Sequence, residues 1–326
     1  MALDPAMARL LEFLAASAQQ DWTTTPIEQT RAGILALQLG AREGDPVYAH
    51  PTTVRDLEVP GAVGPLKARY YRPEATAGDD TTPLILFFHG GGYVLFDLET
   101  HDAQARALAV HGGAAVLSVD YRLAPEDPYP AAADDCEAVA RWLVEHAADF
   151  DAAPDRIAVA GDSAGGNLAA VTCLRLAASG GPRLLAQVLI YPNTSSTGDF
   201  PSIVENAEGY FLTTAQMEWF QAQYCPTGSD PADWGRSPLV APADLLAATP
   251  PAVVCTAEYD PLRDEGEAYA ERLREAGVPV WSRRYGGLVH GFFGFGPFVP
   301  AAATAIVEVA QAFRTLAATT DATTVA

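Results

Sequence analysis

Short apolar runs alternate along the chain with longer segments whose apolar positions recur at helical spacing. The runs are rich in β-branched and aromatic residues, which is typical of buried strands. The expected strands are 52–60, 65–73, 84–88, 114–120, 157–160, 184–191, 251–256 and 278–285. The expected helices among them are 130–148, 167–178, 263–276 and 302–316. Strands that alternate with helices predict an α/β fold with a parallel sheet.

Three segments fall outside this alternation. Residues 1–50 place their apolar side chains near helical spacing, and residues 198–235 are rich in aromatic side chains and interrupt the order of strands and helices. Residues 319–326, TTDATTVA, are expected to form a frayed tail. We therefore predict one core made of residues 51–197 and 236–318.

Length and composition agree with one large domain. The chain has 326 residues, of which 49% are hydrophobic, and this is ample for a large core. The formal net charge is -21 and Lys67 is the single lysine, so no nucleic-acid partner is expected. The acidity reflects either a salt-rich habitat or a GC-rich genome, and we favour the second because alanine and arginine are abundant.

Cysteine usage and hydropathy argue for an intracellular protein without metal. Four cysteines lie far apart and form no C-x-x-C pair, so we expect free thiols, with neither a disulfide framework nor a zinc site. The first residues, MALDPAMARLLEFLAAS, lack a basic start, and Arg9 and Glu12 break their apolar run. No apolar stretch is long enough to span a bilayer, and we expect a cytoplasmic protein.

One pentapeptide indicates a nucleophile. Residues 161–165 read G-D-S-A-G between an expected strand and an expected helix, the context of the nucleophile elbow in α/β-hydrolases. The glycines allow a sharp turn, and Ser163 would lie at a helix N-terminus, where negative charge is favoured. The pentapeptide alone is weak evidence, because an ordinary strand-to-helix turn would also fit it.

A second glycine-rich turn follows the strand expected at 84–88. Residues 89–92 read H-G-G-G, and the backbone N–H groups of such a turn can bind an anion. We interpret the turn as an oxyanion hole, which stabilises the tetrahedral intermediate of acyl transfer. A phosphate-binding loop is the alternative, but the lysine of a P-loop and the pattern G-x-G-x-x-G are both missing.

Five motifs together resemble the hormone-sensitive-lipase family of esterases (bacterial family IV), a branch of the α/β-hydrolases. They are HGGGYV (89–94), YRLAPEDPYPA (121–131), GDSAGGN (161–167), EYDPLRDEG (258–266) and HGF (290–292). The resemblance covers roughly residues 60 to 317 and implies a mostly parallel eight-stranded sheet flanked by helices. It also implies a helical cap over the active site, formed by residues 1–50 and 198–235.

The cap insertion contains side chains that could line a substrate pocket. Most of them are expected to pack the insertion itself, and which of them reach the substrate stays open. The candidates are Phe200, Tyr210, Phe211, Met217, Trp219, Phe220, Tyr224 and Trp234.

The catalytic base and its orienting acid follow from order along the chain and from the resemblance. His290 comes after the strand 278–285 and is last in the order Ser, Asp, His that α/β-hydrolases use. Asp260 follows the strand 251–256 and is the acid that the family motif implies, with Glu258 and Asp264 as competitors. Structural roles are expected for the other candidates, which are His50, His89, His101, His111, His146, Asp162, Arg122 and Glu126.

These assignments predict a serine carboxylesterase for small esters with short to medium acyl chains. The backbone N–H groups of Gly91, Gly92 and Ala164 would form the oxyanion hole, and an acyl-enzyme would form on Ser163. No metal or organic cofactor is implied, and we expect a monomer or a homodimer. The alternatives are an amide, lactone or drug-ester hydrolase on the same triad, a non-catalytic small-molecule receptor, and an interaction protein that uses its acidic surface.

Overall fold

The centre of the computed structural model is an eight-stranded sheet within the part of the chain that it describes. The described residues are 2–17, 24–42, 45–50, 52–79 and 81–324. The strands are β1 (Thr52–Pro60), β2 (Pro65–Pro73), β3 (Leu84–Phe88), β4 (Ala115–Val119), β5 (Ile157–Asp162), β6 (Gln187–Ile190), β7 (Ala252–Tyr259) and β8 (Val280–Val289). Their order is β1-β2-β4-β3-β5-β6-β7-β8. β1 and β2 are antiparallel to their neighbours and the other strands are parallel, which confirms the predicted mostly parallel sheet.

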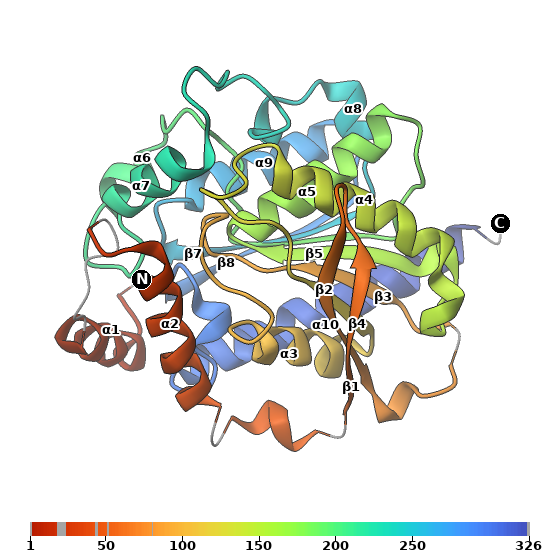
Figure 1. Cartoon of the computed structure of the whole chain (residues 1–326), viewed down its shortest axis with the longest axis horizontal. Coiled ribbons are helices and arrows are strands. Elements are labelled where there is room, and N and C mark those ends of the chain that lie inside the picture. The colour runs from red at the N-terminus through yellow and green to blue at the C-terminus, as the bar shows by residue number, and fades with distance from the viewer. Residues whose placement is uncertain (1, 18–23, 43–44, 51, 80, 325–326) are drawn as a thin grey trace.

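Helices cover both faces of the sheet (Figure 1). α3 (Asp102–Gly112) and α10 (Pro300–Thr324) lie on one face, and α4 (Ala131–Glu145), α5 (Ala164–Ala178) and α9 (Arg263–Glu275) lie on the other. The short helix α8 (Ala243–Ala247) packs beside α5 and α9. This arrangement is the three-layer sandwich that alternating strands and helices predict.

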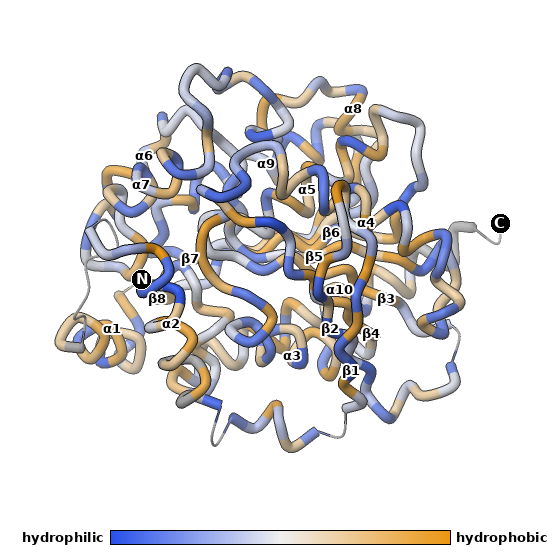
Figure 2. Tube along the Cα trace, viewed as in Figure 1, coloured by the Kyte–Doolittle hydropathy of each residue, from blue (hydrophilic) through white to orange (hydrophobic). Residues whose placement is uncertain are grey.

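Both faces of the sheet are buried, and this explains why its strands are continuous hydrophobic runs. Alternate residues of a strand point to opposite faces, so Leu86 packs in the cluster under α4 and α5. Its neighbours Ile85 and Phe87 pack in the cluster under α3 and α10. A strand buried in this way has no polar face, and Figure 2 shows the hydrophobic strands running through the middle of the molecule.

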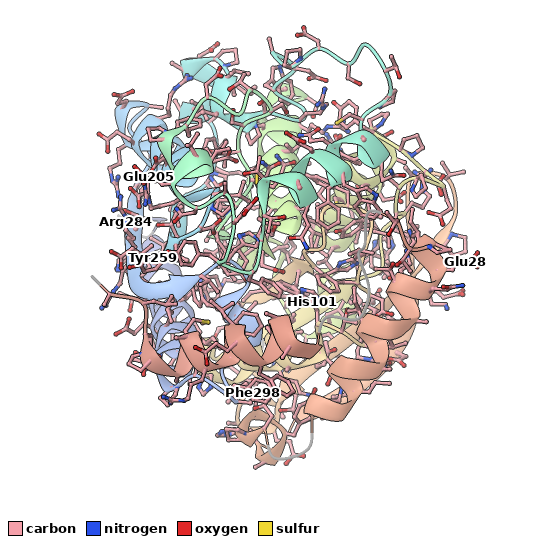
Figure 3. All side chains as sticks on the ribbon, turned by 90° about the vertical axis from the view of Figure 1, so that its left-hand side faces the viewer. Glu28, His101, Glu205, Tyr259, Arg284 and Phe298 are labelled. Atoms are coloured by element: carbon pink, nitrogen blue, oxygen red, sulfur yellow. The ribbon has the colours of Figure 1, made fainter. Side chains whose placement is uncertain are left out.

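A group of helices gathers at the end of the sheet toward which the parallel strands run. α1 (Pro5–Ser17) and α2 (Ile27–Ala41) lie there with α6 (Pro201–Glu205) and α7 (Thr214–Tyr224), which come from the segment between β6 and α8 (Figures 1 and 3). Arg31 of α2 donates to the carbonyl of Val94 at 2.9 Å. The second N-terminal helix, α2, is therefore tied to the turn that follows β3.

The C-terminal helix differs from the sequence-based expectation. α10 does not end near residue 316 but continues to Thr324, through most of the segment expected to be a tail. No Gly or Pro interrupts this alanine- and threonine-rich stretch, so nothing in it terminates the helix. Residues 325–326 lie outside the described residues.

Three further expectations concern the state of the cysteines, metal binding and membrane-spanning helices. All four cysteines are free thiols, and Cys136, Cys173 and Cys255 are buried. In the described part of the chain, no cluster of three or more His, Cys, Asp or Glu side chains could hold a metal ion. Among those same residues, no helix is both long and apolar enough to cross a lipid bilayer.

Candidate active site

Ser163 sits on a strained turn between β5 and α5. Its φ is +54° and its ψ is -117°, a region that costs a non-glycine residue about 1–3 kcal/mol. The turn is held by hydrogen bonds from Ser163 N to Ile190 O (2.9 Å) and from Asn167 N to Ser163 O (3.1 Å). A Cβ atom on Gly165 would overlap the carbonyl oxygen of Phe88, so the glycine lets α5 start directly against β3. Residues 161–165 therefore form the sharp strand-to-helix turn that a nucleophile elbow requires.

The three predicted catalytic side chains meet at the carboxyl ends of β5, β7 and β8. His290 Nε2 lies 2.9 Å from Ser163 Oγ, and His290 Nδ1 lies 2.8 Å from Asp260 Oδ2. Asp260 is fully buried, and its other oxygen accepts the backbone N–H of Leu262 at 2.8 Å. A carboxylate fixed in this way orients the imidazole so that its free nitrogen faces the serine.

The two competing carboxylates lie elsewhere. Glu258 accepts the backbone N–H of Gly287 at 2.8 Å. Asp264 lies in the first turn of α9, where it accepts from Arg263 at 2.7 Å and from Ser202 N at 2.9 Å. Among the described residues, the His290 ring pairs with Asp260 and Ser163 and with neither of these two carboxylates.

The candidate oxyanion hole lies in the turn after β3. Gly91 and Gly92 have φ values of +102° and +61°, which a residue with a Cβ rarely adopts. Within the described residues, the N–H groups of Gly91, Gly92 and Ala164 donate to no protein acceptor. They are therefore available to a substrate oxygen beside Ser163.

Asp162 and its histidine neighbours hold this turn against the elbow. Asp162 Oδ1 accepts Gly90 N at 2.9 Å and lies 3.3 Å from His101 Nε2. Burial opposes the charge of Asp162, but the nearby His101, His89 and Gly90 N–H outweigh it and lower its pKa. Burial also lowers the pKa of His89 to about 4, so this side chain stays neutral. The structural roles predicted for Asp162, His89 and His101 agree with these contacts.

The remaining residues given structural roles lie away from the serine. His50 is the C-cap of the short 3₁₀ helix Pro46–Ala49, and His146 is the C-cap of α4. His111 lies in the last turn of α3. Arg122 pairs with the buried Asp135 at 2.8 Å, and Glu126 pairs with Arg31.

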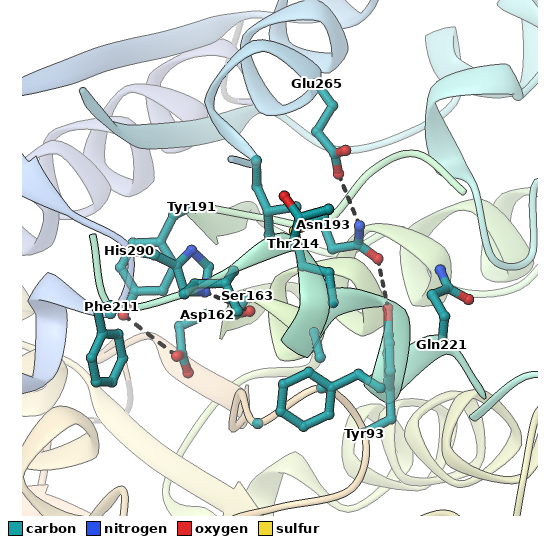
Figure 4. Close-up of a pocket in the computed structure, with 18 of the residues that line it drawn as sticks. Tyr93, Asp162, Ser163, Tyr191, Asn193, Phe211, Thr214, Gln221, Glu265 and His290 are labelled. Carbon is teal, nitrogen blue, oxygen red and sulfur yellow. Dashed lines mark hydrogen bonds between the residues drawn. The ribbon is translucent and has the colours of Figure 1, made fainter. Parts of the chain in front are cut away.

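A cavity of about 570 Å³ opens above Ser163. The turns that follow the parallel strands form its base, and the insertion between β6 and α8 forms part of its wall (Figure 4). Of the aromatic and Met side chains considered for the pocket, Phe211, Met217 and Phe220 line it. Tyr224 instead is buried and stacks on Tyr93, with ring centroids 3.7 Å apart. The size is that of small-molecule pockets, about 300–1,000 Å³.

Three polar residues of the pocket wall form a hydrogen-bonded network that the sequence analysis did not identify. Glu265, Asn193 and Tyr93 line the cavity and are joined by hydrogen bonds (Figure 4). Glu265 follows Asp260 within EYDPLRDEG and Tyr93 lies in HGGGYV, so the motifs contain both of them. Their mutual contact joins residues far apart in sequence, and no local pattern could have found it.

Glu265 should give the stability of the protein a pH dependence that Glu265→Gln removes. Burial raises the pKa of Glu265 to about 8, against the effect of hydrogen bonds from Thr194 N, Ser195 N and Asn193. The unfolded chain ionises Glu265 near its ordinary pKa of about 4.3, whereas the folded protein keeps the proton up to about pH 8. This group therefore destabilises the fold progressively as pH rises through that window, and adds no further loss above it.

The measurement is thermal unfolding of wild type and Glu265→Gln between about pH 5 and about pH 9. We expect the melting temperature of the variant to gain on that of wild type as pH rises. Curves that stay parallel across the window would contradict the raised pKa of Glu265.

Comparison with known proteins agrees with this geometry. A family model described as "alpha/beta hydrolase fold" matches residues 85–294. The carboxylic ester hydrolase LipN of Mycobacterium tuberculosis is 45% identical over 267 residues, which cover 80% of this chain and 70% of that protein. An arylesterase of Saccharolobus solfataricus is 37% identical over 90% of this chain and 93% of its own length.

A solved structure shows the same architecture over nearly the whole chain. The hyperthermophilic esterase of the archaeon Pyrobaculum calidifontis superposes with a TM-score of 0.90 at 40% identity, covering 97% of this chain and 99% of that one. The motifs, the sheet order and these similarities coincide on the same residues. The chain therefore belongs to the α/β-hydrolase family, in its hormone-sensitive-lipase branch of esterases (bacterial family IV).

Proposed function

We propose that this protein is a serine carboxylesterase that hydrolyses small carboxylic esters with short to medium acyl chains. The observation that carries the proposal is the hydrogen-bonded series Ser163, His290 and Asp260 beside three backbone N–H groups that donate to no acceptor in the described part of the chain. Such a group activates a serine hydroxyl and stabilises the oxyanion that forms when it attacks a carbonyl. Relatives named as ester hydrolases support the same activity.

The proposed reaction proceeds through an acyl-enzyme. His290 takes the proton of Ser163 as its oxygen attacks the ester carbonyl, and Asp260 stabilises the imidazolium that results. The N–H groups of Gly91, Gly92 and Ala164 bind the oxyanion of the tetrahedral intermediate. His290 then protonates the departing alcohol, and water releases the acid from Ser163 by the same steps in reverse.

We propose that residues 1–50 and 198–235 form the cap of this site and that residues 51–197 and 236–318 form the catalytic core. The position of α6 and α7 over the pocket supports the assignment of residues 198–235 to the cap, because residues of that segment contribute to the pocket wall. A pocket of about 570 Å³ favours a small ester over a long insoluble triglyceride.

A series of p-nitrophenyl esters with increasing acyl length tests the activity and sizes the pocket. We expect kcat/KM to peak at short or medium chains and to fall for the long ones, because a long acyl chain exceeds a pocket in the usual range of about 300–1,000 Å³. Steady-state hydrolysis of each ester by the wild-type protein measures kcat/KM as a function of acyl length. A peak at the longest chains would contradict the size argument, and no turnover of any ester by folded protein would contradict the function.

Two further proposals come from the sequence. The four free thiols support a cytoplasmic location, where cysteines stay reduced, and cell fractionation would test it. A monomeric or homodimeric state is proposed as well, and light scattering would decide between the two.

A further inference from the structure

Glu265 is a buried acid in the pocket wall that the proposed reaction does not use. It is 1% exposed, and three donors converge on its Oε1 atom. They are Thr194 N at 2.6 Å, Asn193 Nδ2 at 2.9 Å and Ser195 N at 3.2 Å. Burying a carboxyl group is costly unless it is hydrogen-bonded, and so many donors on one oxygen indicate a built feature rather than an accident of packing.

One of its partners, Asn193, contacts both the nucleophile elbow and the turn that follows β3. Its backbone N–H donates to the carbonyl of Ser163 at 3.2 Å, and its own carbonyl accepts Asn167 Nδ2 of α5 at 2.9 Å. Its side-chain Oδ1 accepts the hydroxyl of Tyr93 at 3.2 Å. Asn193 therefore joins the nucleophile elbow to the turn that carries Gly91 and Gly92 (Figure 4).

Glu265 is the nearer of two acceptors that orient the Asn193 amide. The amide has a donating and an accepting end, and two acceptors select its NH₂ group: Glu265 Oε1 at 2.9 Å and the backbone carbonyl of Ser195 at 3.2 Å. The oxygen end is then left for the hydroxyl of Tyr93, which is the residue directly after Gly92. The ring of Tyr93 is also held by its stacking on Tyr224.

We propose that Glu265 is a positioning residue for ester hydrolysis, which through Asn193 and Tyr93 sets the placement of the oxyanion hole relative to Ser163. This inference rests on the proposed function. Oxyanion donors act at about 2.7–3.1 Å from the developing charge, and a misplacement of about 1 Å can cost about 10²-fold in rate. A network that joins the donors to the nucleophile is therefore expected to act on kcat.

The protonation state does not decide the role. Because the pKa of Glu265 lies near 8, the side chain is largely protonated at neutral pH, yet Oε1 can accept hydrogen bonds in either form. Glutamine keeps that acceptor, whereas leucine has a similar size and no polar atom. The two replacements therefore separate the hydrogen bonds from the volume of the side chain.

The test compares Glu265→Gln and Glu265→Leu with a matched control on the same helix. Glu267 of α9 forms a surface ion pair with Arg284 and does not line the cavity, so Glu267→Leu serves as the control. For a short p-nitrophenyl ester, we expect Glu265→Leu to lower kcat by about 10²-fold with KM changed less than about threefold. Glu265→Gln should stay within about threefold of wild type, and Glu267→Leu should not change kcat. A folded leucine variant with wild-type kcat would overturn the proposal.

Tyr93→Phe keeps the test valid where the leucine variant fails to fold. It removes one hydroxyl and leaves Glu265 in place, and we expect kcat to fall about 5- to 10-fold, the worth of one hydrogen bond. In the Glu265→Leu background the same change should have a smaller effect, because the Asn193 amide has lost the shorter of the two contacts that orient its NH₂ group. If Glu265 were merely structural, the losses of kcat caused by Glu265→Leu and by Tyr93→Phe would be independent and would add in free energy in the double variant. Tyr93→Phe with wild-type kcat would overturn the proposal by itself.

A second readout separates this inference from the function on which it rests. The rate at which a fluorophosphonate probe labels Ser163 depends on the nucleophile and the oxyanion donors, but not on ester turnover. Wild type that is labelled but hydrolyses no ester would refute the proposed function alone. Labelling of Glu265→Leu and Tyr93→Phe at the wild-type rate would then refute the positioning role.

Discussion

Ser163→Ala is expected to lower kcat for a short p-nitrophenyl ester by about 10⁴–10⁶-fold. Alanine removes the oxygen that lies 2.9 Å from His290 Nε2 and with it the acyl-enzyme. The loss should be in kcat, because the pocket wall and the unpaired N–H groups remain to bind substrate. The methyl group fits where the serine side chain was, so the fold should be retained.

Hydrolysis assays at high enzyme concentration and probe labelling measure this effect. Ser179→Ala is the matched control, because Ser179 caps the far end of the same helix α5 and does not line the cavity. It should keep wild-type activity. Activity of Ser163→Ala near that of wild type would remove Ser163 as the nucleophile.

Asp260→Asn is expected to lower kcat by about 10⁴-fold while the protein remains folded. The carboxylate accepts a hydrogen bond from His290 Nδ1–H at 2.8 Å. This holds the tautomer in which Nε2 carries no proton and faces Ser163. An amide at this place can present its NH₂ group to Nδ1 and favour the wrong tautomer. It also removes the negative charge that stabilises the imidazolium.

The same replacement at the two competing acids provides the control. Glu258→Gln and Asp264→Asn change carboxylates that contact Gly287 and Arg263 rather than the imidazole. Each should cost less than about tenfold in kcat, which steady-state assays with the same ester would show. If either of them cost more than Asp260→Asn, the assignment of the orienting acid would be wrong.

The sequence was informative about the site wherever chemistry depends on a local turn. G-D-S-A-G between a strand and a helix predicts a serine at a helix N-terminus, and the structure has that serine with φ of +54°. H-G-G-G after a buried strand predicts exposed backbone N–H groups, and two of these glycines have positive φ. Such features are set by a few neighbouring residues, so a short motif suffices to specify them.

Other parts of the site could not be read from the sequence because they arise between distant segments. Nothing near Glu265 indicates that its partners are Asn193 and, beyond it, Tyr93, which come from the turns after β6 and β3. The choice of Phe211, Met217 and Phe220 as pocket residues depends equally on how the insertion lies over the core. The extension of α10 to Thr324 is a different case, since a polar, small-residue end gives no clear stop signal.

The sequence by itself determined the order of strands and helices, the two glycine turns and the identity of the three candidate catalytic side chains. Apolar periodicity and glycine placement are local, so the elements and turns can be worked out within about a dozen residues. The identity of Asp260 and His290 also needed the order of motifs along the chain and the resemblance to a known family. Only the tertiary structure decided that Ser163 and His290, 127 residues apart, lie within hydrogen-bond distance. It also decided which side chains brace them. Parallel strands bring their carboxyl ends to one edge of the sheet, and the contacts made there depend on the packing of the whole core.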